Sequence, residues 1–184
     1  MFTRTLGDDA ELRLLEARQA NLLFALVDGN RPHLRRFLPW VDHTRTVEDS
    51  RAFIELTLRQ FAQSNGFHAG IWSQGELAGV IGHHRIDWSN GATTLGYWLG
   101  ERFQGKGLMT RAVEAFLHHA FVEVKLNRLE IRCAVENDRS RAIPERLGFK
   151  PEGVIRDAEW LYDHYVDHVI YGQLAREYHA RAAR

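Results

Sequence analysis

Cysteine is nearly missing from this chain of 184 residues, which has only Cys133. A single cysteine excludes an internal disulfide and any metal site built from several thiolates, and it is typical of a protein from a reducing compartment. Long apolar runs are missing too, since no segment approaches the ~20 apolar residues of a membrane-spanning helix. The first residues, Met1-Phe2-Thr3-Arg4, lack the apolar core of a signal peptide. We therefore expect a cytoplasmic protein.

An excess of charge of either sign is also missing, because 24 basic residues balance 24 acidic ones. No overall field then draws the chain to nucleic acid or to a membrane surface, and we expect neither as a partner. The sequence shows no internal repeat, low-complexity segment or linker. A chain of this length buries roughly 70% of the surface that its unfolded form exposes. We expect one domain over residues 1–184.

Ten histidines raise the question of a metal site. The pairs at 83–84 and 118–119 are adjacent in sequence, so their side chains diverge on a strand or a helix. His164 and His168 on one strand would stand about 13 Å apart at ~3.3 Å per residue. These spacings do not favour shared ligation, and we expect no metal.

The segment Tyr97–Ala112, Y-W-L-G-E-R-F-Q-G-K-G-L-M-T-R-A, has the pattern of a strand, a turn and a helix. Apolar residues alternate up to Leu99, and Trp98 makes the run apolar on both faces, as in a covered central strand. Gly100 ends the strand. A helical spacing of apolar residues begins at Leu108.

The turn inside this segment has the spacing R-x-x-G-x-G. Two glycines let the backbone approach a ligand without a Cβ atom in the way, and the N–H groups of the first helical turn point outward at the positive end of the helix dipole. This arrangement is typical of a phosphate site. Positive charge and a hydroxyl gather at the same place, on Arg102, Lys106, Arg111 and Thr110.

Two other phosphate-binding motifs share part of this pattern. A dinucleotide fold begins with G-x-G-x-x-G, but here Thr110 occupies the third glycine position, and the unit lies in the middle of the chain rather than opening a βαβ pair. A P-loop would need G-K-[ST], which does not occur here. Nucleotide binding through the glycine turn stays open, and it predicts affinity for a free nucleotide.

The R-x-x-G-x-G turn after an apolar strand resembles the pyrophosphate-binding motif of the GNAT superfamily, the acetyl-coenzyme A dependent N-acetyltransferases. A second passage resembles the same family: a strand R-L-E-I-R-C-A-V, then E-N-D-R-S-R-A-I-P-E-R-L-G-F, over residues 128–149. The spacing of Asn137, Ser140 and Gly148-Phe149 is similar to that of the RimL/RimJ branch, which acetylates the N-termini of ribosomal proteins, and most of all to its YdaF-type members. The resemblance covers nearly the whole chain.

This resemblance implies an α/β fold of the α+β kind, a mixed and mostly antiparallel sheet, split between its fourth and fifth strands, with helices on both faces. Acetyl-coenzyme A would be the cosubstrate, with its thioester in the split and its carbonyl polarised by a strand N–H. The family also implies a homodimer or higher homo-oligomer that associates through the C-terminal strands. The coenzyme-binding residues would be Tyr97, Trp98, Leu99, Arg102, Gln104, Gly105, Lys106, Gly107, Thr110, Asn137 and Ser140.

Periodicity, caps and turn residues predict the remaining elements. Helices are expected over 17–27, 33–38 and 138–147, after Thr46, and as a tail over 175–184; strands are expected over 11–15, 67–72, 77–86, 128–135, 154–162 and 164–174.

Forming an amide from a thioester and an amine needs a neutral amine, a polarised carbonyl and a proton for the leaving thiolate. An α-amino group has a pKa of about 7.7 to 8.0 and is partly neutral at pH 7, so a carboxylate acting directly or through one water suffices as base. The resemblance implies that Glu159, in A-E-W on the penultimate strand, is this base. Taken alone, Glu159 has the pattern of a solvent-facing charge.

The proton donor for the thiolate is implied by the same resemblance to be Ser140, three residues after Asn137. The alternative is a first-turn serine that caps the helix backbone. Asn137 would hydrogen-bond the pantetheine arm, cap the helix, or do both. Tyrosines are rivals for the acid role, and the sequence does not choose among Tyr162, Tyr165 and Tyr171.

Cys133 lies within an apolar strand pattern, so we expect a small buried residue rather than an acyl-cysteine nucleophile. On the acceptor side, Phe37, Trp40 and Val41 would either contact substrate or cap the core. Scattered acidity that would attract an ammonium group is found at Asp42, Glu48, Asp49 and Asp87.

The function we expect is acetyl transfer to the N-terminus of a protein such as a ribosomal protein, reached through a local epitope. A small-molecule amine is the runner-up acceptor. A module that binds coenzyme A without catalysis is the alternative of another class. The sequence leaves open the acceptor, the oligomer size and the acyl-chain length.

Overall fold

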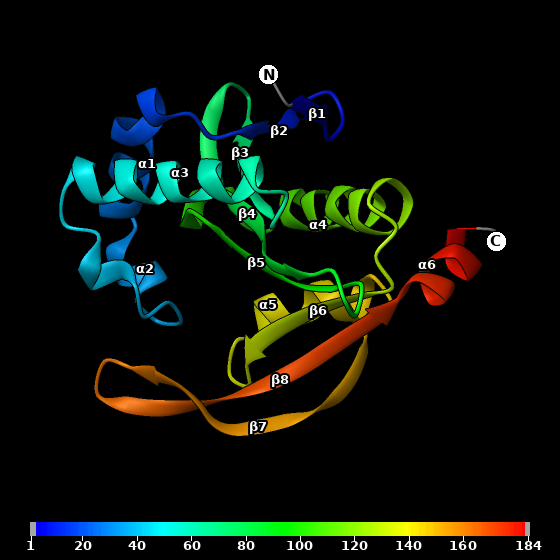
Figure 1. The fold of residues 1–184 in the computed structure, drawn as a ribbon. Helices are drawn as coiled ribbons and strands as arrows, with labels where there is room; N and C mark the ends of the chain where they lie inside the picture. The colour runs from blue at the N-terminus through cyan, green and yellow to red at the C-terminus, as the bar shows by residue number, and fades with distance from the viewer. Residues whose placement is uncertain (1–2, 183–184) are drawn as a thin grey trace. The chain divides into compact units, whose positions relative to one another are not determined.

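The computed structural model describes residues 3–182, which form a mixed sheet of eight strands and six α-helices (Figure 1). The strands are hydrogen-bonded in the order β1-β2-β3-β4-β5-β6-β8-β7. The chain divides into two compact units. Unit 1 extends to Gly82 and resumes over Tyr97–Ala112, and unit 2 holds His83–Gly96 and continues from Val113.

Unit 1 begins with three antiparallel strands, β1 (Thr3–Thr5), β2 (Ala10–Leu14) and β3 (Phe67–Ser73). A two-residue turn leads from β3 into β4 (Glu76–Asp87), and both turn residues, Gln74 and Gly75, have positive φ, as tight hairpins require. The hairpin that alternation predicted is therefore confirmed.

The helices of unit 1 are α1 (Ala20–Asp28), α2 (Arg31–Leu34) and α3 (Val47–Ala62), of which α1 and α3 pack together (Figure 1). The helix predicted over 33–38 is shorter and earlier. Pro32 occupies its first turn, and turns carry the chain from Leu34 toward Pro39, before which helical backbone is disfavoured. The core beneath these helices includes Leu15, Ala20, Leu23, Ile54, Trp72, Leu77 and Val80.

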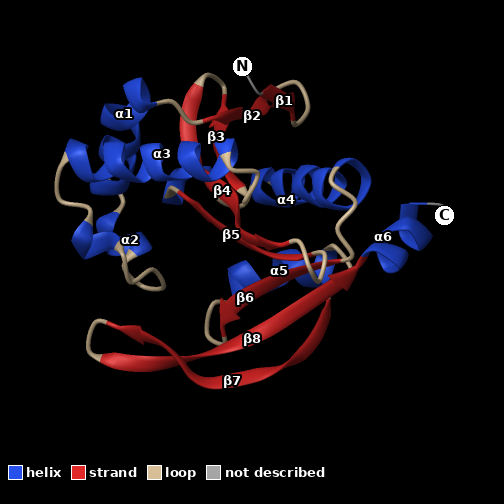
Figure 2. Ribbon diagram, in the orientation of Figure 1, coloured by secondary structure: helices blue, strands red, loops and turns tan. Residues whose placement is uncertain are grey.

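Unit 2 is built on β6 (Arg128–Ala134), β7 (Lys150–Leu161) and β8 (His164–Leu174), with β8 antiparallel to both of the others (Figure 2). Its helices are α5 (Asp138–Arg146) and α6 (Ala175–Ala182). All of these elements were predicted within a few residues. The last two residues of the predicted tail, 183–184, lie outside the described part of the chain.

The junction of β5 (Ala92–Leu99) with β6 is parallel and short. It joins Ala92, Thr93 and Thr94 to Arg128, Leu129 and Glu130, and so covers three of the eight residues of β5. This is the place where the resemblance implied a split. The resemblance placed the split between the fourth and fifth strands, and here it lies between β5 and β6 because Thr3–Thr5 adds a strand at the start of the chain.

The long helix α4 (Leu108–His118) ends in a π-helical turn at His119–Glu123, which apolar spacing did not predict. Within unit 2, its Phe116 lies beside the ring of His83, with ring centroids 4.9 Å apart. No helix among residues 3–182 is long and apolar enough to cross a membrane.

Thr46 caps α3 and allows a stability test. Its Oγ1 accepts the N–H of Asp49 at 3.3 Å, and the Asp49 carboxylate accepts the N–H of Thr46 at 2.8 Å. Replacing Thr46 with Ala leaves that helix N–H without its cap, and we expect a loss of ~1 kcal/mol in the free energy of unfolding. Denaturant unfolding measures this, with Thr46→Ser as a control that keeps the oxygen. Equal stability of Thr46→Ala and wild type would contradict the prediction.

Candidate functional site

The glycine-rich loop lies between β5 and α4, in unit 1. Gly105 and Gly107 have φ of +75° and +70°, where glycine is strongly favoured. A Cβ atom at either position would meet no heavy atom of the described residues within 4 Å. Backbone conformation therefore requires these glycines, and the space over both is open, as a cradle for a phosphate ligand needs to be.

The start of α4 follows this loop directly, because the N–H of Arg111 donates to the carbonyl of Gly107 at 3.1 Å. Residues 108–110 thus form the first turn of the helix, where backbone N–H groups point toward the helix N-terminus. They belong to the positive end of the helix dipole. The glycine turn and the helix start that the sequence predicted are therefore present in the backbone.

The two arginines beside the loop are paired with carboxylates. The Arg111 guanidinium donates to the Leu6 carbonyl and to the Asp9 carboxylate, each at 2.7 Å, and this hydrogen bond holds the pKa of Asp9 below its usual value. Arg102 stacks over the Phe103 ring at 4.5 Å and forms an ion pair with Glu76. Both arginines thus contact carboxylates of unit 1.

The remaining loop residues lie close to the helix start. Lys106 is exposed, and Thr110 is half-buried in the first turn of α4. Gln104 approaches α2, with its Nε2 2.9 Å from Nε2 of His33. A cation, a hydroxyl and an amide therefore accompany the glycine backbone.

The strand residues Tyr97, Trp98 and Leu99 precede the loop on β5. The Trp98 ring lies 5.7 Å from the Trp40 ring and packs on the small core of Val27, Leu34 and Val41. Its partly buried side chain therefore packs against the core. The core-capping interpretation of Trp40 and Val41 is confirmed.

In unit 2, Asn137 caps α5 by accepting the N–H of Ser140 at 3.2 Å. The Ser140 Oγ lies 3.2 Å from Sγ of Cys133, which is buried at 3% exposure. Cys133 is therefore the small buried residue that its strand pattern predicted. Sequence spacing brought Asn137 and Ser140 together correctly, while the contact of Ser140 with Cys133 depends on how α5 packs on β6.

Tyr171 is occupied by a hydrogen-bond network that holds α5 on the sheet. Its hydroxyl donates to Glu145 at 2.6 Å and accepts from Nε of Arg141 at 3.1 Å, and Arg141 also donates to the Val135 carbonyl. Burial raises the pKa of Tyr171. Of the other tyrosines, Tyr165 is exposed near the start of β8 and Tyr162 lies in the turn between β7 and β8 with φ of +63°.

Strand register separates two candidate groups. Cys133 lies opposite Val169, and the next residue, Ala134, lies opposite His168. Because neighbouring side chains point to opposite faces of a sheet and paired residues share a face, His168 lies on the face away from Cys133, Ser140 and α5. Glu159 shares the face of His168, and its Oε2 lies 3.6 Å from the Nε2 of that ring.

His168 was not among the candidate catalytic residues that the sequence offered. The sequence analysis considered His168 only as a possible metal ligand. The approach of His168 to Glu159 depends on the pairing of β7 with β8, which the sequence does not reveal. The Glu159 side chain is 33% exposed and that of His168 is 15% exposed, so the carboxylate lies beside a more buried imidazole and still faces solvent in part. Among residues 3–182, no three His, Cys, Asp or Glu side chains gather as metal ligands would.

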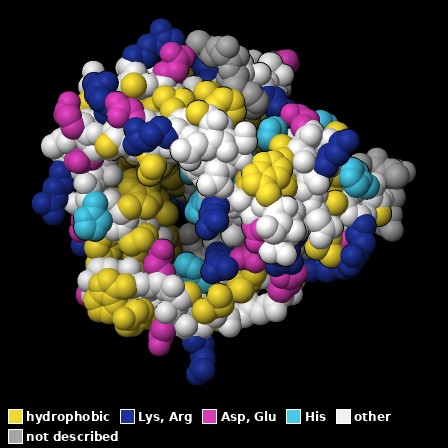
Figure 3. Space-filling view, in the orientation of Figure 1, with side chains coloured by type: hydrophobic (Ala, Val, Ile, Leu, Met, Phe, Trp, Pro, Cys, Tyr) yellow, Lys and Arg dark blue, Asp and Glu magenta, His cyan; other side chains and the backbone are white. Residues whose placement is uncertain are grey.

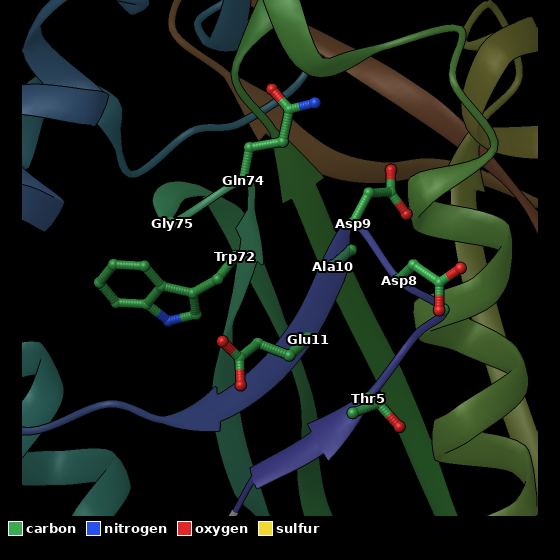
Figure 4. A pocket seen from close by; sticks show the side chains of 9 residues that line it. Thr5, Asp8, Asp9, Ala10, Glu11, Trp72, Gln74 and Gly75 are labelled. Atoms are coloured by element: carbon green, nitrogen blue, oxygen red, sulfur yellow. The ribbon is translucent and has the colours of Figure 1, made fainter.

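A separate open depression of about 440 Å³ lies in unit 1 (Figure 4). Its lining includes Asp9, Glu11 and Trp72, and it contains none of the residues expected to bind a coenzyme. Arg111 and Arg13 form hydrogen bonds with the two carboxylates and lower their pKa values. Two of the acidic side chains that line the depression are therefore paired with arginines of the protein itself.

Known proteins resemble this chain over most of its length. The family model of the acetyltransferase (GNAT) domain matches residues 10–150, which begins in unit 1 and ends in unit 2. The "Putative ribosomal N-acetyltransferase YdaF" of Bacillus subtilis (strain 168) is 37% identical, covering 97% of this chain and 98% of that protein. The ribosomal-protein-serine acetyltransferase of Escherichia coli (strain K12) is 32% identical over 94% of this chain and 96% of its own.

Solved structures agree with this. RimL, a ribosomal L7/L12 alpha-N-protein acetyltransferase in complex with coenzyme A, superposes with a TM-score of 0.92 at 28% identity, covering 96% of this chain and 99% of that one. The microcin C7 self-immunity acetyltransferase MccE, in complex with acetyl-CoA and AMP, has a TM-score of 0.86 at 30% identity, covering 92% and 94%. With its glycine loop, its mixed sheet and these relatives, the chain belongs to the GNAT family and is an N-acetyltransferase.

Proposed function

We propose that this enzyme transfers acetyl from acetyl-CoA to the N-terminal α-amine of a protein, with a ribosomal protein as the acceptor. The observation that carries the coenzyme assignment is the open glycine backbone of Gly105 and Gly107 at the start of α4. The acceptor assignment is supported by the ribosomal relatives, which match nearly the full chain. Such an acceptor and acetyl-CoA both favour a cytoplasmic reaction.

The coenzyme pyrophosphate would accept hydrogen bonds from the N–H groups of the loop and of the first turn of α4, at the positive end of the helix dipole. Lys106, Arg102, Gln104 and Thr110 would supplement them with charge and polar groups. A backbone N–H of Tyr97, Trp98 or Leu99 would polarise the thioester carbonyl. Asn137 would hydrogen-bond the pantetheine arm in addition to capping α5.

In the transfer step, the amine nitrogen forms a bond with the acetyl carbon and the carbon–sulfur bond breaks. Glu159 would take the proton that the amine loses, and the Ser140 hydroxyl would give a proton to the thiolate and recover one from solvent. The two side chains lie on opposite faces of the β6-β8-β7 sheet, but β6 ends at Ala134, opposite His168, and Glu159 lies beyond that end, opposite Val166. Because the amine and the thiolate share one carbon, the two groups would have to meet the substrate past the end of β6. Removal of one proton and delivery of the other are thus assigned to separate groups.

Ser140 is preferred over Tyr171 and Tyr165 for the acid role. Tyr171 already donates its proton to Glu145, and Tyr165 is 58% exposed against Trp160. The Ser140 hydroxyl instead lies at the end of β6, beside a buried sulfur. Because one acetyltransferase domain model matches residues 10–150, we infer that residues 1–184 work as one acetyltransferase domain.

A small-molecule amine is the second candidate acceptor. It is favoured by the likeness to MccE, whose structure holds acetyl-CoA together with AMP, a small molecule. The balanced net charge of this chain fits either acceptor, because no broad field selects a highly charged partner.

The proposed acetyl transfer is tested by measuring thiol release from acetyl-CoA, with N-terminal peptides of ribosomal proteins and small amines offered as acceptors. We expect acceptor-dependent turnover that falls at least tenfold in Glu159→Gln, about 1.4 kcal/mol of transition-state stabilisation. Ser140→Ala, run beside it, should lower kcat with little change in the KM for acetyl-CoA. Turnover with a peptide would identify a protein as the acceptor, and turnover with an amine alone would identify a small molecule as the acceptor. Background rates with every acceptor, together with intact coenzyme A binding, would support a non-catalytic module.

The glycine loop is tested by binding of coenzyme A to Gly107→Ala. The added Cβ strains a positive φ and occupies the open space over the loop, so we expect the Kd to rise about tenfold, or about 1.4 kcal/mol. Gly75→Ala is the matched control, since Gly75 also has positive φ and open space but lies in the β3–β4 turn. Calorimetry should show weakened binding only for Gly107→Ala. Competition by a free nucleotide as strong as that by coenzyme A would instead favour a nucleotide site.

We also infer a homo-oligomer formed through β7 and β8. By strand order β7 is at the sheet edge, and it is exposed along most of its length, which leaves an edge open for pairing. Large apolar side chains stand out on these strands, and the patch at the lower left of Figure 3 lies over the end of the β7–β8 hairpin. The exposed residues are Val154, Ile155, Trp160 and Tyr165.

Light scattering after size-exclusion chromatography should give a mass above the 21.3 kDa of one chain. We expect Val154→Asp to shift the protein toward that single-chain mass, because a charge at a buried interface lacks a partner. Leu56→Asp on α3 is the matched control, since Leu56 is 59% exposed and Val154 is 55% exposed. A wild-type mass of one chain would contradict the inference.

A further inference from the structure

The pairing of β7 with β8 is interrupted beside Glu159. Ile155 lies opposite His168, and pairing resumes with Glu159 opposite Val166. Three residues of β7, at 156–158, therefore face only Asp167 of β8. Two extra residues form a bulge, a device that often redirects a side chain next to an active site.

The bulge is held by a specific contact. Asp157 has φ of +49°, a backbone conformation that residues other than glycine seldom adopt. Its N–H donates to Oδ1 of Asp167 at 2.9 Å. The carboxylate of Asp167 thus supplies the hydrogen bond that the interrupted strand pairing no longer provides.

The bulge decides which part of β8 Glu159 faces. If the pairing of Ile155 with His168 continued without interruption, Glu159 would lie opposite His164, two residues nearer the turn, or about 7 Å away along the strand. The two extra residues bring Glu159 back to Val166, and so within reach of His168. The separation of 3.6 Å between Nε2 and Oε2 follows from this shift.

His168 is also the basic group best placed for this carboxylate among its strand neighbours. Arg132, on the same face of β6 and opposite Ile170, donates to Glu130 at 2.6 Å. The imidazole is more buried than the carboxylate, at 15% against 33% exposure, so the ring supports Glu159 from within while part of the carboxylate stays accessible.

We propose that Asp167 and His168 are positioning residues for Glu159. Asp167 fixes the bulge, and the Nε2–H group of His168 donates a hydrogen bond to one carboxylate oxygen of Glu159. The other oxygen is then held ready to accept the proton of the acceptor amine. Catalytic hydrogen bonds are often long before substrate binds and shorten in the complex, which fits the 3.6 Å separation. The inference rests on the proposed role of Glu159 as base.

Paired variants separate positioning from mere stability. We expect Asp167→Ala and His168→Leu to lower kcat about tenfold while the KM for acetyl-CoA stays within about twofold. Asp167→Asn keeps an oxygen that accepts the Asp157 N–H, and His168→Gln keeps an Nε2 donor, so both should recover most of the rate. In a Glu159→Gln background, His168→Leu should cause little further loss, because the two residues act as a unit. Full kcat in Asp167→Ala and His168→Leu would overturn the proposal.

A second measurement does not depend on turnover. The ring signals of His168, identified in NMR spectra by their loss in His168→Gln, should move in Glu159→Gln and in Asp167→Ala but not in Asp167→Asn. Unchanged signals in Glu159→Gln would overturn the pairing even in an active enzyme. Conversely, shifted signals in a protein that turns over no acceptor would uphold the pairing and count against the proposed function. Thermal unfolding of each variant confirms that it is folded.

Discussion

The register of β6, β8 and β7 is the constraint on which the proposed chemistry depends. Side chains alternate between the faces of a sheet, so a slip of one residue would exchange every group on one face for those on the other. The observed pairing places Cys133 beside Ser140 on the α5 face and Glu159 beside His168 on the opposite face. Register therefore assigns the proposed acid and base to separate sides.

The register is supported by polar contacts as well as by strand hydrogen bonds. Tyr171 is almost fully buried and joins β8 to α5 through Glu145 and Arg141, and Arg141 also reaches the end of β6. A buried hydroxyl without partners is costly, so this network favours one placement of α5 over others. The start of that helix carries Asn137 and Ser140, whose positions follow from the same contacts.

The glycine loop is governed by local conformation instead. Positive φ at Gly105 and Gly107 and the start of α4 are properties of a short segment, and short segments are where sequence patterns are most informative. The side chains around the loop are not local in this sense. Arg111 reaches back to Leu6 and Asp9, and Arg102 to Glu76, so their partners depend on the folding of distant strands.

Sequence by itself determined the order of the helices and strands after β1, the hairpin, the cap at Thr46, the glycine loop and the pairing of Asn137 with Ser140, because each depends on periodicity or on residues a few positions apart. It also singled out Glu159, although only through family resemblance. Tertiary structure decided the rest: the bulge at Asp157, the approach of His168 to Glu159, and the core position of the Trp98 ring. These depend on strand pairing and packing between segments far apart in the chain, which no local pattern encodes.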